Sequence, residues 1–218
     1  LAARLGSDRA PEGLFLVMQP IMSLTDPYGS LNFEVLIRMR EPDGSVTPGG
    51  VIVAAAENNG RAAVLDRWVL SNVLAWLERY HDALPVTRFV TMNLSGASLN
   101  DERFIQDAFA MLASSPRATQ RLCVEVTEGV ALHDLDNTRR FIDRVRSTGA
   151  KVALDDFGAG YTSFSYLKEL PVDALKIDGS FIVNMNAHPA NLAIVEATVE
   201  LGRHLGMKSI AEWAEDRA

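Results

Sequence analysis

The sequence predicts an α/β fold, and within that class a barrel built largely from parallel strands. Short apolar runs of strand character alternate along the chain with amphipathic segments of helical spacing. This alternation is typical of parallel strands connected by helices. In addition, polar residues recur at the ends of most strand segments, and a barrel gathers such residues from many strands at one rim.

The strand segments can be read directly from the apolar runs. In order along the chain they are 15–22, 32–40, 88–95, 121–128, 151–157, 174–178 and 208–213. A doubly wound sheet would instead gather its site at one switch point, usually beside a glycine-rich phosphate loop. No such loop follows the first strand segment, so the barrel is the favoured architecture.

The helices are indicated by apolar residues at helical spacing. The clearest is RAAVLDRWVLSNVLAWLERY (61–80), which predicts a helix with one buried stripe. The pair Thr47-Pro48 indicates another helix start. Two further helices are predicted at 137–147 and 190–205, with Gly149 and Gly206 as their C-terminal stops.

Glu34 does not fit a purely parallel barrel, because it lies near the start of its strand segment. Either this strand extends upstream of the rim, or a neighbouring strand runs antiparallel. Alternation along the strand places Glu34, Leu36 and Arg38 on one face. A carboxylate and a guanidinium therefore point into the same cavity in this prediction.

The acids at the strand ends point to divalent cations. The polar residues at these positions are Glu34, Asn93, Glu125, Asp155, Asp156, Lys176 and Glu212. Carboxylates brought together at one rim repel one another strongly, and cations with oxygen ligands relieve that repulsion. Singly, each acid is better explained as a helix cap or a surface ion-pair partner. The recurrence of the pattern favours a metal-assisted enzyme.

Composition excludes several other functions. The formal net charge of −7 argues against a surface that coats a DNA or RNA duplex. The four histidines are scattered without helical pairs, which disfavours zinc. Cys123 is the only cysteine, and with no histidine near it in sequence we expect a small core residue rather than a nucleophile.

The ends of the sequence also carry expectations. We find no apolar run near the ~20 residues that span a membrane, and no signal-peptide pattern. Residues 1–13 are predicted to be a linker or an N-terminal helix, and 14–218 a single barrel domain. Seven strand segments are one short of a complete barrel. We therefore expect the final strand and helix to be missing after Ala218.

Six motifs, taken together, resemble one family. FEVLIRM, MNLS, VEVTE, LDDFGAGYTSFSYL, LPVDALKID and IAEWAE occur in this order. From about Leu14 onward the chain resembles the EAL-domain phosphodiesterases of bacterial cyclic di-GMP signalling. The resemblance implies a modified (β/α)8 barrel of the TIM type with one antiparallel strand, which would accommodate Glu34. It also implies cleavage of cyclic di-GMP to the linear dinucleotide with two Mg²⁺ or Mn²⁺ ions.

The resemblance also assigns expected roles to residues of this chain. The matching metal ligands are Glu34, Asn93, Glu125 and Asp155 for one ion, and Asp155, Asp156 and Glu212 for the other. The implied catalytic group comprises Lys176 beside the attacking water, Glu212, and Glu128 as the acid that holds the loop after Asp156. Gln19 and Arg38 match positions near the sugar and phosphates of the substrate.

Three departures from the family pattern accompany this match. Val35 stands where alanine is usual, and it points away from the Glu34 face. Trp213 replaces the glycine that usually follows Glu212. The downstream glutamine and closing strand of the family lie beyond Ala218.

Other functions and partners stay open at this point. A non-catalytic cyclic di-GMP receptor is the first alternative to the enzyme. An enolase-type barrel enzyme, with a lysine base beside carboxylate-bound Mg²⁺, is the second. The resemblance implies attachment to N-terminal sensory or GGDEF-type domains and a cytoplasmic location, either free or within a membrane-bound protein. It leaves a homodimer open.

Overall fold

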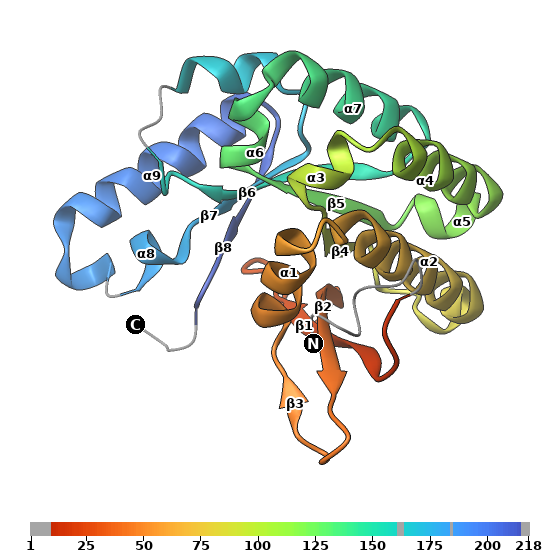
Figure 1. The fold of residues 1–218 in the computed structure, drawn as a ribbon. Coiled ribbons are helices and arrows are strands. Elements are labelled where there is room, and N and C mark those ends of the chain that lie inside the picture. The colour runs from red at the N-terminus through yellow and green to blue at the C-terminus, as the bar shows by residue number, and fades with distance from the viewer. Residues whose placement is uncertain (1–9, 161–163, 184, 215–218) are drawn as a thin grey trace. The chain divides into compact units, whose positions relative to one another are not determined.

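The computed structural model describes residues 10–160, 164–183 and 185–214. They fall into two compact units, and each is described by itself. The first unit comprises Leu1–Val124 with Thr148–Ala150, and the second comprises Glu125–Ser147 with Lys151–Ala218. Figure 1 labels the elements of both units along the chain.

The first unit contains the antiparallel pairing that the position of Glu34 requires. Strand β1 (Leu14–Ile21) runs antiparallel to β2 (Asn32–Arg40), while β4 (Val90–Asn93) runs parallel to β2. A short strand not predicted from the sequence, β3 (Val46–Thr47), pairs with the end of β2. Glu34 lies opposite Gln19 on one side and Thr91 on the other. Of the two explanations offered for Glu34, an antiparallel neighbour is therefore present.

The helices of the first unit pack their apolar faces inward. They are α1 (Gly49–Asn58), α2 (Ala62–Tyr80), α3 (Gly96–Leu99), α4 (Glu102–Ser114) and α5 (Pro116–Thr119), with a 3-10 turn at His81–Ala83. The predicted helix over 61–80 is confirmed, and it buries Leu65, Val69 and Leu77. Helix α1 begins at Gly49, with Pro48 at the cap position and Thr47 still in β3.

Strand β5 (Leu122–Thr127) crosses from the first unit into the second. Its apolar residues are almost fully buried, and Cys123 is 4% exposed. The expectation that this cysteine is a small core residue is thus confirmed by its burial.

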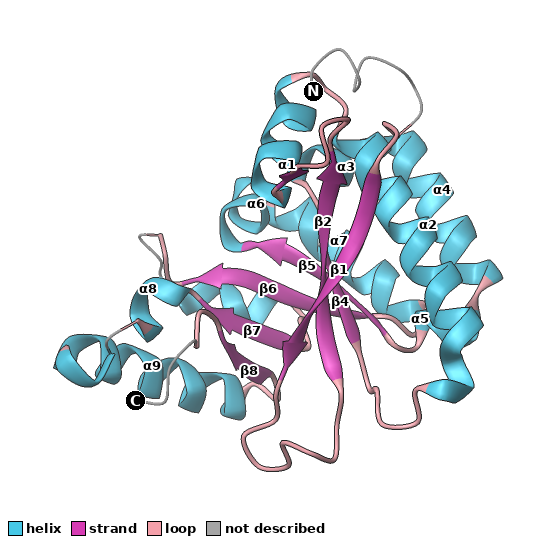
Figure 2. Cartoon of the chain, turned by 90° about the horizontal axis from the view of Figure 1, so that it is seen from below, coloured by secondary structure: helices cyan, strands magenta, loops and turns pink. Residues whose placement is uncertain are grey.

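The second unit is built on three parallel strands covered by helices. β6 (Lys151–Phe157), β7 (Ala174–Ile177) and β8 (Lys208–Ala211) pair in this order, and they lie side by side in Figure 2. The helices are α6 (Glu128–His133), α7 (Leu135–Ser147), α8 (Gly179–Ile182) and α9 (Pro189–His204), with 3-10 turns at Phe164–Glu169 and Met185–Ala187. A polar residue lies at or directly after the end of each strand: Asp156 in β6, Asp178 after β7 and Glu212 after β8.

Glycine ends two of the predicted helices, as the sequence suggested. Gly149 follows α7 with φ 93°, and Gly206 follows α9 with φ 74°. Side chains other than glycine rarely adopt this left-handed conformation without strain. Both stops are therefore confirmed, and the predicted bounds of 137–147 and 190–205 differ from the observed helices by one or two residues.

Some strand bounds were predicted too long. The segment 88–95 forms a strand only over 90–93, and β8 ends at Ala211, so Glu212 and Trp213 lie just past the strand. Residues 10–13 contain a turn rather than a helix, and residues 1–9 lie outside the described part. Within the described residues, no helix combines the length and apolar character needed to cross a membrane.

Candidate functional site

Two consecutive aspartates at the end of β6 present their carboxylates to the same region. On a regular strand, neighbouring side chains point to opposite faces. Here the pairing of β6 with β7 shifts register between Leu154 and Phe157, and Asp156 has φ 53°. A bulge of this kind re-aims a side chain, and aspartate tolerates the left-handed conformation better than most residues. The local backbone thus brings both acids together.

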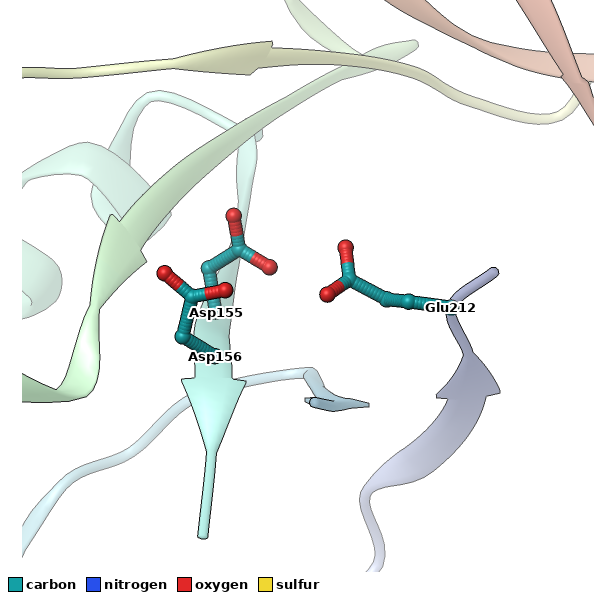
Figure 3. Close-up of side chains that lie close together, drawn as sticks. All are labelled: Asp155, Asp156 and Glu212. Carbon is teal, nitrogen blue, oxygen red and sulfur yellow. The ribbon is translucent and has the colours of Figure 1, made fainter. Parts of the chain in front are cut away.

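Glu212 completes an acidic cluster with this pair. One carboxylate oxygen from each of Asp155, Asp156 and Glu212 lies within 4.8 Å of the other two. Figure 3 shows the two aspartates on β6 and Glu212 beyond β8 pointing toward one another. Asp155 is buried, Glu212 is half-buried and Asp156 is exposed, so the cluster is open to solvent on one side.

Lys176 lies among three carboxylates. Its Nζ donates a hydrogen bond to Glu125 at 2.8 Å, and it lies 2.9 Å from Asp155 Oδ1 and 2.9 Å from Glu212 Oε1. The lysine is only 2% exposed. A buried ammonium requires such partners, because removing a charge from water is costly unless it is paired.

The charge balance of this cluster favours a bound cation. Burial raises the pKa of Glu212 to about 7; the Asp155 and Asp156 carboxylates also raise it, while Lys176 opposes the rise. Asp155 Oδ1 is buried and accepts no hydrogen bond within the described residues, although Lys176 lies in ion-pair contact. Grouped carboxylate oxygens with spare acceptor capacity are the ligands that Mg²⁺ and Mn²⁺ prefer. The residues present therefore fit a divalent cation.

Glu125 and Glu128 lie three residues apart but have different partners. Glu125, on β5, is 1% exposed and contacts Lys176. Glu128 is the first residue of α6, whose N-cap is Thr127. Its carboxylate accepts a hydrogen bond from the Gly158 backbone N–H at 3.0 Å and another from the Tyr166 hydroxyl. Glu128 thus ties the segment after β6 to the end of β5.

Tyr166 is a partner that sequence reasoning missed. It lies in the 3-10 turn that follows the loop, and it is 7% exposed. Burial raises its pKa, and the hydrogen bond to Glu128 raises it further. The predicted contact between Glu128 and the loop is seen at Gly158, while Tyr161 and Thr162 lie outside the described residues.

In the first unit, Glu34 and Asn93 are brought together. The Asn93 side-chain amide donates a hydrogen bond to Glu34 Oε1 at 2.7 Å. Gln19 lies opposite Glu34 in the register of β1 and β2. Arg38 Nη1 donates to the backbone carbonyl of Ile37 at 2.8 Å. The even alternation along β2 is confirmed: Glu34, Leu36 and Arg38 are half-buried, and the residues between them, including Val35, are buried.

A buried aspartate fixes the backbone beyond Asn93, and no pattern in the sequence indicates this contact. Asp66 Oδ2, on α2, accepts hydrogen bonds from the Ser95 N–H at 2.9 Å, the Ser95 hydroxyl at 2.7 Å and the Ser98 hydroxyl at 2.6 Å. Burial raises the pKa of Asp66, and these hydrogen bonds oppose the rise. This contact is invisible in the sequence because Asp66 sits within an ordinary helical pattern.

Comparison with known proteins identifies the family. The family model described as "EAL domain" matches residues 6–218, which is nearly the whole chain. The chain therefore belongs to the EAL domain family. It is 32% identical over 99% of its length to the cyclic di-GMP phosphodiesterase PdeB of Shewanella oneidensis. It is 33% identical over 93% of its length to the cyclic di-GMP phosphodiesterase NbdA of Pseudomonas aeruginosa.

Solved structures confirm the predicted fold class. A PaMucR phosphodiesterase in complex with c-di-GMP matches with TM-score 0.85 and 30% identity, covering 94% of this chain and 83% of that one. The FimX EAL domain from Pseudomonas aeruginosa, bound to c-di-GMP, matches with TM-score 0.82 and 26% identity, covering 94% and 81%. The chain thus has the TIM-like α/β fold of EAL domains, in which β1 runs antiparallel to β2.

The chain spans about a quarter of the length of the curated relatives it matches. The aligned part is 25% of PdeB and 26% of NbdA. Those relatives are therefore longer proteins in which an EAL domain is one part.

Proposed function

We propose that this domain hydrolyses cyclic di-GMP to the linear dinucleotide with the help of Mg²⁺ or Mn²⁺. The observation that carries the proposal is the cluster of Asp155, Asp156 and Glu212 beside the buried Lys176. The likeness to proteins named as cyclic di-GMP phosphodiesterases supports the choice of substrate.

The acids would hold two cations. Asp155, Asp156 and Glu212 would hold one ion, and Glu34, Asn93, Glu125 and Asp155 the other. When bound, two such ions supply a Lewis-acid clamp on the attacked phosphate and lower the pKa of the attacking water. Within the first unit the hydrogen bond from Asn93 holds the Glu34 carboxylate, and within the second unit Lys176 holds the Glu125 carboxylate; the family resemblance is what joins them in one ligand set.

Lys176 orients the attacking water in this mechanism. Its ammonium has three N–H groups that can donate hydrogen bonds, and it lies in ion-pair contact with Glu125, Asp155 and Glu212. The water oxygen attacks phosphorus and gives up a proton, the bond from phosphorus to the 3′ oxygen breaks, and the proton released by the water ends on that oxygen. Arg38 neutralises phosphate charge, and Gln19 contacts the sugar. The bonds that Glu128 accepts hold the segment after Asp156 in position.

The proposal is tested by incubating the purified protein with cyclic di-GMP and either Mg²⁺ or Mn²⁺. We expect chromatography to detect the linear dinucleotide, and we expect EDTA to abolish its formation. Binding of cyclic di-GMP with metal present but without linear product would instead establish a receptor. Neither binding nor cleavage would favour a different barrel enzyme, such as the enolase type.

The longer relatives support a second part of the proposal. We infer that the domain acts within a larger protein, attached to sensory or GGDEF-type domains, and that it works in the cytoplasm.

Replacing Glu128 with alanine should lower turnover by about tenfold or more while the fold persists. Charge-assisted hydrogen bonds of the kind it accepts from Gly158 and Tyr166 are worth roughly 1.5–3 kcal/mol each, and their loss would free the segment after Asp156. Tyr166→Phe removes one of the two bonds and should have a smaller effect. Steady-state kinetics and far-ultraviolet circular dichroism measure both; wild-type kinetics in Glu128→Ala would contradict this role.

The affinity for Mg²⁺ should rise with pH up to about 7 and then level off. The pKa of Glu212 lies above its ordinary value of 4.5, at about 7. Between these two values a proton occupies the carboxylate in the metal-free protein and competes with the cation. Calorimetric titrations from pH 5.5 to 8.5 would measure this trend. Glu212→Gln should bind Mg²⁺ more weakly with a flatter pH dependence, and equal slopes in the two proteins would contradict this assignment.

A further inference from the structure

Trp213 is held in an unusual backbone conformation at the edge of the acidic cluster. It follows Glu212 directly and has φ 52°. A left-handed backbone is strained for a bulky side chain, and such outliers gather at functional sites. Trp213 is also 63% exposed, whereas Trp68 and Trp76 are half-buried. The strained backbone and the exposed ring together require an explanation other than packing in the core.

Gly179 provides the space in which the indole ring stands. A Cβ atom at this glycine would lie 2.2 Å from Trp213 Cδ2, 2.4 Å from Cγ and 2.7 Å from Cε3. The ring therefore occupies the place of the missing side chain. Gly179 is buried and begins α8, three residues after Lys176. One edge of the indole is thus fixed against the backbone beside the site, and the rest of the ring is open.

We propose that Trp213 is a stacking platform for one guanine base of the dinucleotide, and so determines affinity for the substrate. This inference rests on the proposed function. A rigid aromatic ring next to carboxylates is poorly suited to bind phosphate, but a nucleobase stacks on its face. Because Trp213 adjoins Glu212 and its support adjoins β7, a base on the ring lies beside the proposed metal ligands.

The test compares three variants in the full-length protein. Trp213→Ala removes the ring, Trp213→Phe keeps an aromatic platform, and Gly179→Ala displaces the indole without changing it. Stacking on one base contributes roughly 1–3 kcal/mol, equivalent to about 5- to 150-fold in affinity. We expect Trp213→Ala and Gly179→Ala to raise the KM for cyclic di-GMP at least fivefold, with a smaller change in kcat. Trp213→Phe should recover most of the affinity.

Two further measurements separate this inference from the proposed function and from a merely structural role. The first compares kcat/KM for cyclic di-GMP with kcat/KM for bis(p-nitrophenyl) phosphate, a phosphodiester that has no nucleobase. The ratio of the two values should fall about tenfold in Trp213→Ala. The second is tryptophan fluorescence: cyclic di-GMP, added with EDTA to prevent turnover, should quench wild-type emission but not that of Trp213→Phe.

The possible outcomes separate a stacking role of Trp213 from a purely structural role and from failure of the proposed function. An unchanged ratio, or quenching that persists in Trp213→Phe, overturns the platform while leaving the phosphodiesterase proposal intact. A lowered melting temperature with wild-type KM also overturns it, since the ring would then serve only the fold. If wild-type protein neither binds nor cleaves cyclic di-GMP, the proposed function fails first, and the platform fails with it.

Discussion

Replacing Lys176 with methionine should lower the free energy of unfolding of the metal-free protein by about 3–5 kcal/mol. The ammonium is buried against Glu125, Asp155 and Glu212. Methionine fills a similar volume but leaves three carboxylates close together without a balancing charge. Denaturant unfolding in EDTA would measure the loss. Lys168→Met, which changes an exposed lysine of the same unit, is the matched control and should change stability by less than about 0.5 kcal/mol.

Divalent cations should restore part of this stability. An ion held by Asp155, Asp156 and Glu212 replaces some of the lost positive charge, and it stabilises the folded protein that binds it. We therefore expect saturating Mg²⁺ to raise the unfolding midpoint of Lys176→Met more than that of the wild type. Turnover of cyclic di-GMP should remain strongly reduced, because the ion does not replace the ammonium that is proposed to orient the attacking water. Equal unfolding curves for the variant and the wild type in EDTA would show that Lys176 does not stabilise the metal-free protein.

The second large effect is expected for Asp155→Ala, which should reduce turnover about 100-fold or more. Asp155 is proposed to contact both cations, and removing a metal ligand weakens binding more than the 10- to 100-fold typical of outer partners. The fold should persist, because Lys176 keeps Glu125 and Glu212 as partners. Glu34→Ala, which removes a ligand of one ion only, should also remove most turnover.

The matched control for this variant is Asp143→Ala, an exposed acid on α7. It changes the net charge by the same amount and should leave kinetics within twofold of the wild type. Calorimetric titration with Mn²⁺ distinguishes a lost ligand from a lost fold. Wild-type metal affinity in Asp155→Ala would contradict the proposed ligand set, even if turnover were impaired.

Much of the site could be predicted because its acids follow strands. In parallel strands the carboxyl ends meet at one edge, so strand order alone placed Asp155, Lys176 and Glu212 near one another. An antiparallel neighbour was one of two explanations for the position of Glu34, and the family resemblance implied one antiparallel strand; the structure shows it as the pairing of β1 with β2. These features depend on the alternation of side chains along each strand and on the order of the strands in the chain, and both can be read from a sequence.

What the sequence did not display are contacts between distant residues and departures from regular geometry. Tyr166 and Glu128 are 38 positions apart, and nothing in either local pattern pairs them. Asp66 looks like any polar residue on a helix, yet it fixes Ser95 near the end of β4. The strained backbone at Trp213 is equally hidden, because residue type at this position suggests a core or surface aromatic instead.

Because β6 is irregular, the Asp155-Asp156 sequence alone would not reproduce the paired carboxylates in another protein. Asp155 and Asp156 face one region only because the register shifts and Asp156 adopts φ 53°. An engineer who transplanted the two aspartates onto a regular strand of another scaffold would see one of them turn to the opposite side. A functional transplant of the acid pair therefore also needs the irregular backbone of β6 and a partner strand whose register fits it.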